Sequence, residues 1–306
     1  MNRLAVVDAG TNSVLYLLAQ KEPDGEIVII HQETKSVRLG KGMVNTGTIR
    51  DEPVKKALDV IAYYKELSRK QGALRVVITG THIFRTAKNR DDVKKQIEEK
   101  TGLTLEILSE GEEARWSYRG AVYGRRLEGK IIVGDIGGGS TEIILGNGKE
   151  ISHTLSLPLG AVGLTEKYLH HDPPGKNELR LLEEDVLSSL QNPEASFLKL
   201  GKQFLGVGGT ATTLATMHLK IQRYDPHRID GYRMTRSDIE NLYSTICRLS
   251  LPDRKKRISF DPERADILIA GAAVLKTLLI VGGFTHMTVS DRGLRFGIAL
   301  REFAVL

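Results

Sequence analysis

The chain is 306 residues long, which is more than one hydrophobic core usually organises, so the length predicts two domains. Its composition of 41% hydrophobic and 27% charged residues excludes the disordered and fibrous classes. The formal net charge of +6 favours an anionic ligand, but weakly, because many basic proteins bind no polyanion.

The cysteine content and the first residues indicate the compartment. A single cysteine, Cys247, excludes an intrachain disulfide, and the start of the chain has no cationic segment followed by an apolar signal core. These features predict a cytoplasmic protein. The longest apolar stretch, residues 267–284, contains Lys276, so we expect a buried helix there rather than a membrane span. Neither a membrane nor a nucleic acid is expected as a partner.

The chain contains an internal repeat. Residues 4–19 (LAVVDAGTNSVLYLLA) and 131–146 (IIVGDIGGGSTEIILG) show the same pattern at a constant offset of 127 residues. The matching pairs are Asp8 with Asp135, Gly10 with Gly137 and Ser13 with Ser140. Each copy predicts a strand, a tight turn and a second strand, and a hairpin turn then leads to a third strand, near 26–32 or 150–157.

Helices and strands are predicted to alternate in the rest of both halves. In the first half we expect helices at 53–71, 91–100 and 109–123, and strands at 75–79 and 103–108. In the second half we expect helices at 161–170, 176–191, 210–219, 236–248 and 263–280, and strands at 203–207 and 286–290. The predicted fold class is therefore α/β in each half. The repeat places the domains at 1–126 and 127–306.

Glycine and hydroxyl residues form three prominent turns. They are Asp8–Ser13 (DAGTNS), Asp135–Thr141 (DIGGGST) and Gly206–Thr213 (GVGGTATT). Glycine lets backbone N–H groups approach phosphate oxygens, and a turn that opens a helix adds the favourable helix N-terminus. A single such turn is usually only a turn, but three of them, two duplicated after an Asp, predict a phosphate cradle. The third turn has neither the Rossmann spacing nor the P-loop lysine.

Four carboxylates lie at predicted strand ends or inside turns, namely Asp8, Asp135, Glu142 and Asp291. Hard Mg²⁺ favours one or two carboxylates together with waters and phosphate oxygens, so acids beside a phosphate cradle suggest a metal site. The alternative is that some of them cap helices or hold the glycine turns by accepting backbone N–H bonds.

Two further features could serve catalysis. Ser109 and Glu112 have the spacing of a capping box, which leaves the neighbouring Glu113 as the candidate base, although acids are common in first helical turns. Arg85 could clamp phosphate with its planar fork of donors, or could be a surface arginine. The basic run at 254–257 is interpreted as a solvated loop rather than as a polyanion site.

Taken together, these segments resemble the exopolyphosphatase and guanosine pentaphosphate phosphatase (Ppx/GppA) family, a branch of the acetate-kinase, sugar-kinase, Hsp70 and actin superfamily. The segments are VVDAGTNSVLYLLA, THIFRTAKN, ILSEGEEAR, VGDIGGGSTEIIL, SLPLGAVGLTEKYL, GVGGTATTLA and SDRGLRFGIAL, which span essentially the whole chain. The resemblance implies two duplicated actin-like (ribonuclease H-like) ATPase-fold domains with an interdomain cleft.

The resemblance also implies an activity and a set of residues. The activity is release of terminal orthophosphate from inorganic polyphosphate or guanosine pentaphosphate, with Mg²⁺ or another divalent cation. The family's catalytic glutamate falls on Glu113, and the metal positions fall on Asp135 and Glu142. The phosphate-binding positions fall on Asp8, Gly10, Asn12, Ser13, Arg85, Gly137, Gly138, Gly139, Ser140, Thr141, Gly208, Gly209 and Thr210.

The sequence also departs from the family pattern. Leu15 stands where many relatives carry a cationic or polar side chain, THIF precedes the arginine where small residues are usual, and Asp230-Gly231 replaces a His-Gly pair. The chain ends soon after SDRGLRFGIAL, as in the short two-domain members, so a short substrate is expected. A kinase or ATPase of the superfamily and a catalytically weak polyphosphate or alarmone sensor remain alternatives, and a homodimer is one arrangement that the sequence allows.

Overall fold

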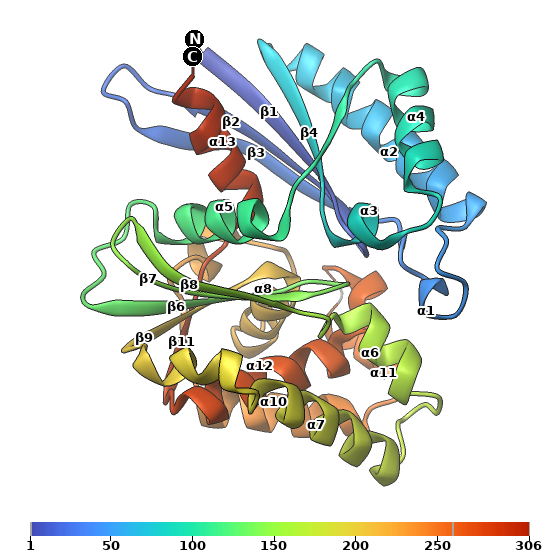
Figure 1. Cartoon of the computed structure of the whole chain (residues 1–306), viewed down its shortest axis with the longest axis vertical. Helices are drawn as coiled ribbons and strands as arrows, with labels where there is room; N and C mark the ends of the chain where they lie inside the picture. The colour runs from blue at the N-terminus through green and yellow to red at the C-terminus, as the bar shows by residue number, and fades with distance from the viewer. Residues whose placement is uncertain (1, 259, 306) are drawn as a thin grey trace. The chain divides into compact units, whose positions relative to one another are not determined.

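The computed structural model describes residues 2–258 and 260–305. Within these ranges the chain forms two compact units, one containing residues 2–120 and 294–305 and the other containing residues 121–293 (Figure 1). Both ends of the chain therefore belong to the first unit.

The first unit is built on a five-stranded sheet with the order β3-β2-β1-β4-β5. Its strands are β1 (Asn2–Ala9), β2 (Ser13–Lys21), β3 (Ile27–Ser36), β4 (Arg75–Gly80) and β5 (Leu105–Ile107). The first three strands are antiparallel neighbours, whereas β4 runs parallel to β1 and β5 runs parallel to β4. The helices are α1 (Met43–Thr46), α2 (Asp51–Lys70), α3 (His82–Thr86), α4 (Arg90–Thr101), α5 (Glu110–Val122) and α13 (Leu294–Phe303).

The second unit repeats this topology and extends it by one strand. Its sheet has the order β10-β11-β9-β6-β7-β8, in which β8-β7-β6-β9-β11 corresponds to β3-β2-β1-β4-β5 with the same strand directions. The added β10 is antiparallel to β11 at the edge. The strands are β6 (Lys130–Ile136), β7 (Thr141–Asn147), β8 (Glu150–Leu157), β9 (Gln203–Val207), β10 (Arg233–Thr235) and β11 (His286–Val289).

Helices cover this second sheet. They are α6 (Ala161–Tyr168), α7 (Lys176–Leu190), η1 (Pro193–Leu200), α8 (Gly208–His218), α9 (Pro226–Ile229), α10 (Arg236–Arg248), α11 (Leu251–Arg257), η2 (Pro262–Arg264) and α12 (Leu268–Gly282). The matching strand orders confirm the predicted duplication and the α/β fold class.

The duplication extends to hydrogen bonds. The N–H of Gly10 donates to the carbonyl of Ser13 at 3.0 Å, and the N–H of Gly137 donates to the carbonyl of Ser140 at the same distance. Because the turns are alike in both sequence and backbone bonding, the repeat reflects one local structure used twice.

Helix α12 is the most apolar element and lies in the core of the second unit. Nearly every side chain from Leu268 to Leu279 is buried, and Lys276 reaches Glu183 with an Nζ–Oε1 distance of 2.7 Å. The expectation of a buried helix is thus confirmed. In the part of the chain that the structure describes, no helix is long and apolar enough to cross a membrane.

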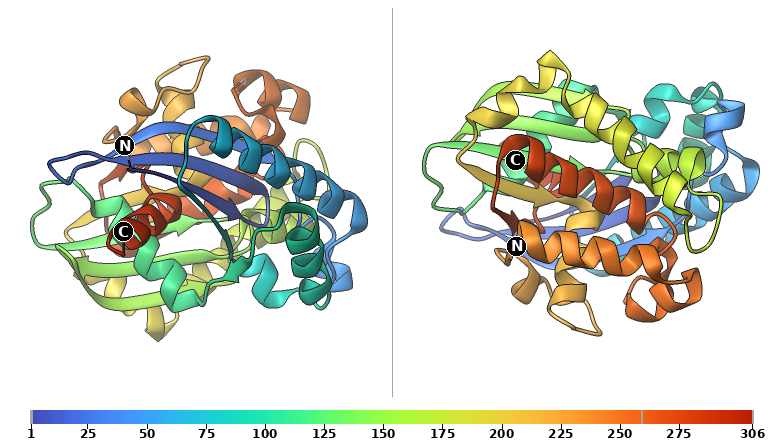
Figure 2. Two further views of the ribbon diagram at one scale, coloured as in Figure 1. Left: turned by 90° about the horizontal axis from the view of Figure 1, so that it is seen from above. Right: turned by 90° about the horizontal axis from the view of Figure 1, so that it is seen from below.

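The compact units differ from the sequence-based domains 1–126 and 127–306 in two ways. The first unit ends at residue 120, and it also includes α13, which the sequence did not predict (Figure 2). Long-range contacts hold α13 there, because Arg295 donates to the carbonyl of Tyr16 at 2.9 Å and Lys21 donates to that of Phe303 at 3.1 Å.

The predicted elements are present, most of them with shifted ends, and the helix predicted at 263–280 begins only at Leu268, as α12. One interpretation was wrong. The basic run at 254–257 lies in helix α11 rather than in a loop. Its first residue, Arg254, is only 5% exposed and donates to the carbonyls of Ala265 and Leu249 and to the carboxylate of Asp172. A buried arginine with three partners has a structural role, which the clustering of charges in the sequence does not reveal.

Candidate functional site

The first turn joins β1 to β2. Asp8 lies near the end of β1, where it pairs with Leu15 of β2 and Thr79 of β4, and it is 7% exposed. Asn12 and Ser13 are also buried, and the Nδ2 of Asn12 donates to the Oγ of Ser13 at 3.1 Å. Burying polar side chains is costly unless they form hydrogen bonds, so the bond between Asn12 and Ser13 helps to hold this turn.

Arg85 and Glu113 form an ion pair in the same unit. The Nη1 of Arg85 lies 2.5 Å from the Oε2 of Glu113 and also donates to the carbonyl of Leu108 at 2.9 Å. Both side chains are largely buried. The Nε and Nη2 of Arg85 are buried and have no hydrogen-bond partner. Such donors are rare in folded proteins, and this guanidinium keeps the capacity to donate further hydrogen bonds.

Glu112 has the capping role that the sequence predicted. Its Oε2 accepts hydrogen bonds from the N–H of Ser109 at 2.9 Å and from the Oγ of Ser109 at 2.7 Å, and its own N–H is 3.3 Å from that Oγ. The hydroxyl hydrogen bond lowers the pKa of Glu112 below the ordinary value, and the backbone hydrogen bond from Ser109 adds to the effect. Glu112 is thereby committed to the start of α5.

The second turn rests on the start of α6. The carbonyl of Gly137 accepts from the N–H of Ala161 at 3.0 Å, and that of Gly138 accepts from Val162 at 2.9 Å. At Gly160 a Cβ would stand 2.2 Å from the carbonyl carbon of Gly139. Only glycine permits this approach, and the turn is consequently held by the backbone of another element.

Glu142 and Asp135 are neighbours across β6 and β7. Glu142 is 2% exposed, and its Oε1 accepts hydrogen bonds from the Oγ of Ser140 at 2.7 Å and the Oγ of Ser156 at 3.0 Å. A third strand thus supports this carboxylate, because Ser156 lies opposite Glu142 on β8.

These two carboxylates are compatible with Mg²⁺, which takes hard oxygen ligands and keeps several waters. The structure describes no group of three or more His, Cys, Asp or Glu side chains arranged to hold a metal ion within residues 2–258 and 260–305. A site with one or two carboxylates completed by phosphate oxygens does not need such a group.

The third turn opens α8. Gly208 has φ 84°, which favours glycine, and a Cβ on it would stand 2.8 Å from the Oδ1 of Asp135. The third turn therefore contacts the carboxylate at the end of β6, which brings it together with the second turn. Thr210, in the first turn of α8, is 3% exposed.

Sequence reasoning missed Arg264, which lies at this third turn. A Cβ on Gly209 would be 2.1 Å from the Nη1 of Arg264, so the guanidinium packs on the glycine. The Nε of Arg264 donates to Asp261 at 3.2 Å, which orients the group. The sequence offered only a single arginine at the start of the helix predicted at 263–280, a position too common to be informative.

The residues at two departures from the family pattern have identifiable surroundings. Leu15 pairs with Asp8 across β1 and β2, as Glu142 pairs with Asp135 across β6 and β7, so Leu15 is the counterpart of Glu142 in the repeat. Asp230 forms an ion pair with Arg125 and accepts from the N–H of Asp291 at 3.0 Å.

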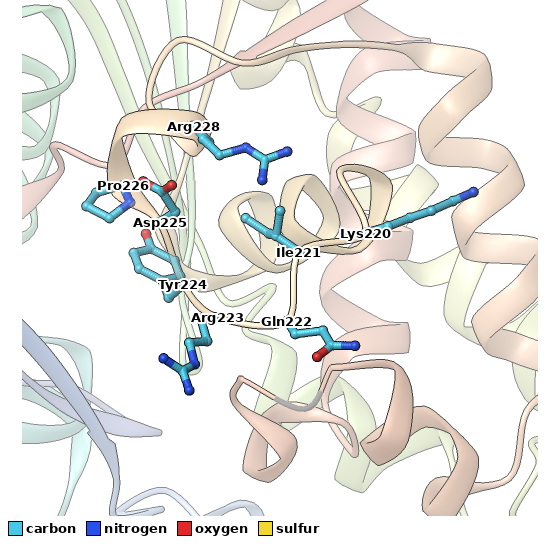
Figure 3. A pocket seen from close by; sticks show the side chains of 8 residues that line it. All are labelled: Lys220, Ile221, Gln222, Arg223, Tyr224, Asp225, Pro226 and Arg228. Atoms are coloured by element: carbon cyan, nitrogen blue, oxygen red, sulfur yellow. The ribbon is translucent and has the colours of Figure 1, made fainter.

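A pocket of about 500 Å³ lies in the second unit, after the end of α8. Figure 3 shows that the side chains of Lys220, Arg223 and Arg228 at its edge point in different directions. Tyr224, which also lines the pocket, donates a hydrogen bond from its Oη to the carboxylate of Asp291. Because its cations do not converge, this pocket is not the phosphate cradle that the turns predict.

Comparisons with known proteins give a consistent result. The model of the Ppx/GppA phosphatase family matches residues 18–304. Exopolyphosphatase 2 of Mycobacterium tuberculosis is 32% identical over 98% of both chains. The crystal structure of the Aquifex aeolicus member of the Ppx/GppA family has a TM-score of 0.83 at 30% identity and covers 99% of this chain and 98% of its own. An exopolyphosphatase structure from Cytophaga hutchinsonii has a TM-score of 0.91 at 24% identity, over 100% and 99% of the two chains, and shows the same fold.

Proposed function

The chain belongs to the Ppx/GppA phosphatase family, and on that premise we propose that it releases terminal orthophosphate from short inorganic polyphosphate and from guanosine pentaphosphate. The general reaction, hydrolysis of a phosphoanhydride, is confirmed by the family and by relatives that are named exopolyphosphatases. The choice between the two substrates is the proposal.

One observation carries the proposed mechanism. Arg85 binds Glu113 through Nη1 and leaves Nε and Nη2 buried without partners. A phosphate oxygen would satisfy these donors, and the guanidinium would then stabilise charge on the phosphoryl group while its other side holds the carboxylate. Glu113 would then orient or deprotonate a water molecule beside the bound phosphate.

The glycine turns would supply further donors. Backbone N–H groups of Gly138, Gly139 and Thr210 are candidates for binding phosphate oxygens, because glycine permits close approach and α8 begins at the third turn.

Asp135 and Glu142 would hold the divalent cation. Bound there, Mg²⁺ would neutralise phosphate charge as the phosphoanhydride bond breaks. The two hydroxyls that donate to Glu142, from Ser140 and Ser156, orient its carboxylate in a buried position.

The proposal is tested by a phosphate-release assay of the pure protein with Mg²⁺. The substrates are tripolyphosphate, longer polyphosphate, guanosine pentaphosphate and ATP, and the matched variants are Glu113→Gln and Glu110→Gln, two acids of the same helical turn. We expect release from polyphosphate and guanosine pentaphosphate that only Glu113→Gln abolishes. Transfer of phosphate from ATP to an acceptor would instead identify a kinase, and tight binding without any release would identify a sensor.

A further inference from the structure

The segment between β3 and α2 carries an unbalanced positive charge. Residues 37–50 contain Arg38, Lys41 and Arg50 and no acidic residue. We call this segment the basic loop. None of its residues belongs to the three turns or to the Arg85–Glu113 pair, so the proposed function does not use it.

The start of the basic loop is fixed against the first turn. The N–H groups of Val37 and Arg38 donate to the carbonyl of Asn12 at 2.9 and 2.8 Å, and that of Gly40 donates to the carbonyl of Thr11 at 2.8 Å. Gly40 packs so closely that a Cβ on it would be 2.2 Å from the Cγ2 of Thr11. The loop therefore lies directly on the proposed phosphate-binding turn of the first unit.

The end of the basic loop is fixed to the segment that follows α3, the helix that carries Arg85. The N–H of Lys88 donates to the carbonyl of Gly47 at 2.9 Å. The side-chain amide of Asn89 pairs with the backbone of Ile49, accepting from its N–H at 2.9 Å and donating to its carbonyl at 2.8 Å. In Figure 1, α1 of the loop lies near α3 at one end of the first sheet. The basic loop thus links the first turn to the segment that follows α3.

Three cations of this region, Lys41, Arg50 and Lys88, are exposed. Among the residues that the structure describes, Lys41, Arg50 and Lys88 form no ion pair. Lys88 adds to the charge of the basic loop, since its Cε would be 2.9 Å from a Cβ on Gly47. Most exposed lysines and arginines contact only solvent. These three lie beside two predicted phosphate-binding elements, where several positive charges together attract a polyanion.

Arg38 has a backbone conformation that is unusual for its residue type. Its φ is 61°, and the only other non-glycine residue with positive φ in the described ranges is Lys220. Lys220 follows the C-terminus of α8, where this conformation commonly ends a helix. Arg38 ends no helix, and its conformation serves to direct two successive N–H groups to Asn12. Strained backbone of this kind marks segments that are held in place at functional sites.

We propose that the basic loop and Lys88 bind the phosphates that follow the terminal one, and so form a subsite for polyphosphate chains longer than tripolyphosphate. This inference rests on the proposed function and deepens it. Lys41 and Lys88 supply mobile point charges suited to a flexible chain, and Arg50 supplies a planar fork for a single phosphate. The interaction is electrostatic, so it weakens as salt is added.

The test measures binding, so that it does not depend on turnover. All proteins carry Glu113→Gln, which prevents turnover. Calorimetry gives the affinity of this protein for tripolyphosphate and for longer linear polyphosphate. The same two affinities are measured after Lys41→Gln and Lys88→Gln are added together, and after Lys70→Gln is added as the matched control. Lys70 is an exposed cation at the other end of α2, about 30 Å along the helix from Arg50 at 1.5 Å per residue. Activity of the wild-type protein, measured separately, tests the proposed function.

We expect the double substitution to weaken binding of the longer polyphosphate by about fivefold to twentyfold, because each exposed charge contributes a factor of about two to five to the affinity. Binding of tripolyphosphate should weaken by less. The difference should shrink in high salt, and Lys70→Gln should change neither affinity. Equal weakening of both ligands, or no weakening of the longer chain, overturns the subsite. Wild-type release of phosphate with unchanged binding in the double variant would leave the proposed function intact and reject this inference alone.

Discussion

Glu112 and Glu113 are adjacent in the first turn of α5, yet their carboxylates have different partners. Glu112 accepts both hydrogen bonds from Ser109, whereas Glu113 accepts a hydrogen bond from the guanidinium of Arg85 at 2.5 Å. Successive residues of a helix point about 100° apart, so one carboxylate turns back to the helix start and the other reaches α3. Glu112 therefore stabilises the start of α5, and the carboxylate of Glu113 is left for the catalytic role that we propose.

Glu113→Gln is expected to reduce phosphate release by about 10² to 10⁴, because an amide of the same shape cannot take a proton from the attacking water. Substrate affinity should be retained, since the turns and Arg85 supply the donors. Steady-state kinetics and calorimetry with polyphosphate measure the two effects. Near wild-type turnover would reject the assignment, and Glu142 would then be the next candidate for the base.

Arg85→Lys should keep the positive charge and still lower phosphate release by about 10² to 10³, a loss typical of removing one donor to a developing charge. Lysine has no planar fork, so it cannot bind Leu108, Glu113 and a phosphate together. Arg69→Lys, an exposed change on α2, is the control. If Arg85→Lys has unchanged kcat and KM, the unpaired Nε and Nη2 do not serve the substrate.

Local features of the site could be predicted from the sequence. The turns Asp8–Ser13 and Asp135–Thr141 share Asp, Gly and Ser at the same spacing, and their backbone hydrogen bonds agree. The capping box at Ser109 likewise depends on residues within one helical turn. Short-range hydrogen bonding fixes these structures, so the order of residues suffices to predict them.

Contacts between distant segments could not be predicted. Arg254 donates hydrogen bonds to Asp172 and to the carbonyl of Ala265, and Arg264 packs on Gly209. The neighbouring residues in the sequence do not distinguish either arginine from a surface residue. The placement of α13 with the first unit depends on Gly297, where a Cβ would be 1.9 Å from the carbonyl oxygen of Trp116. Such approaches depend on the assembled fold rather than on periodicity or spacing.

Glu112→Gln is expected to lower stability by about 0.5–2 kcal/mol at neutral pH, because it weakens the cap of α5. The pKa of Glu112 is lowered in the folded protein, so its stabilising effect is present above the ordinary pKa of a glutamate and is lost as the pH falls through the folded value. Thermal midpoints of the two proteins should therefore differ at pH 7 and converge at acidic pH. A difference that persists unchanged in acid would show that the charge of Glu112 is not responsible.

Gly160→Ala is expected to destabilise the second unit and to weaken phosphate binding at the second turn. The added Cβ would stand 2.2 Å from the carbonyl carbon of Gly139 and 2.4 Å from the carbonyl oxygen of Gly138, and backbone atoms cannot move aside as a flexible side chain can. Overpacking of this kind costs about 1–3 kcal/mol.

Gly111→Ala is the control for this change. Gly111 lies in α5 with no atom within 4 Å of a new Cβ, so alanine there should stabilise the helix by up to about 1 kcal/mol and leave turnover unchanged. For both variants the thermal midpoint is measured with and without polyphosphate. Gly160→Ala should melt at a lower temperature and gain less from the ligand than wild type, because the displaced turn no longer directs its N–H groups to phosphate. If Gly160→Ala melts lower but gains the same stabilisation from polyphosphate, the turn contributes to folding and not to binding.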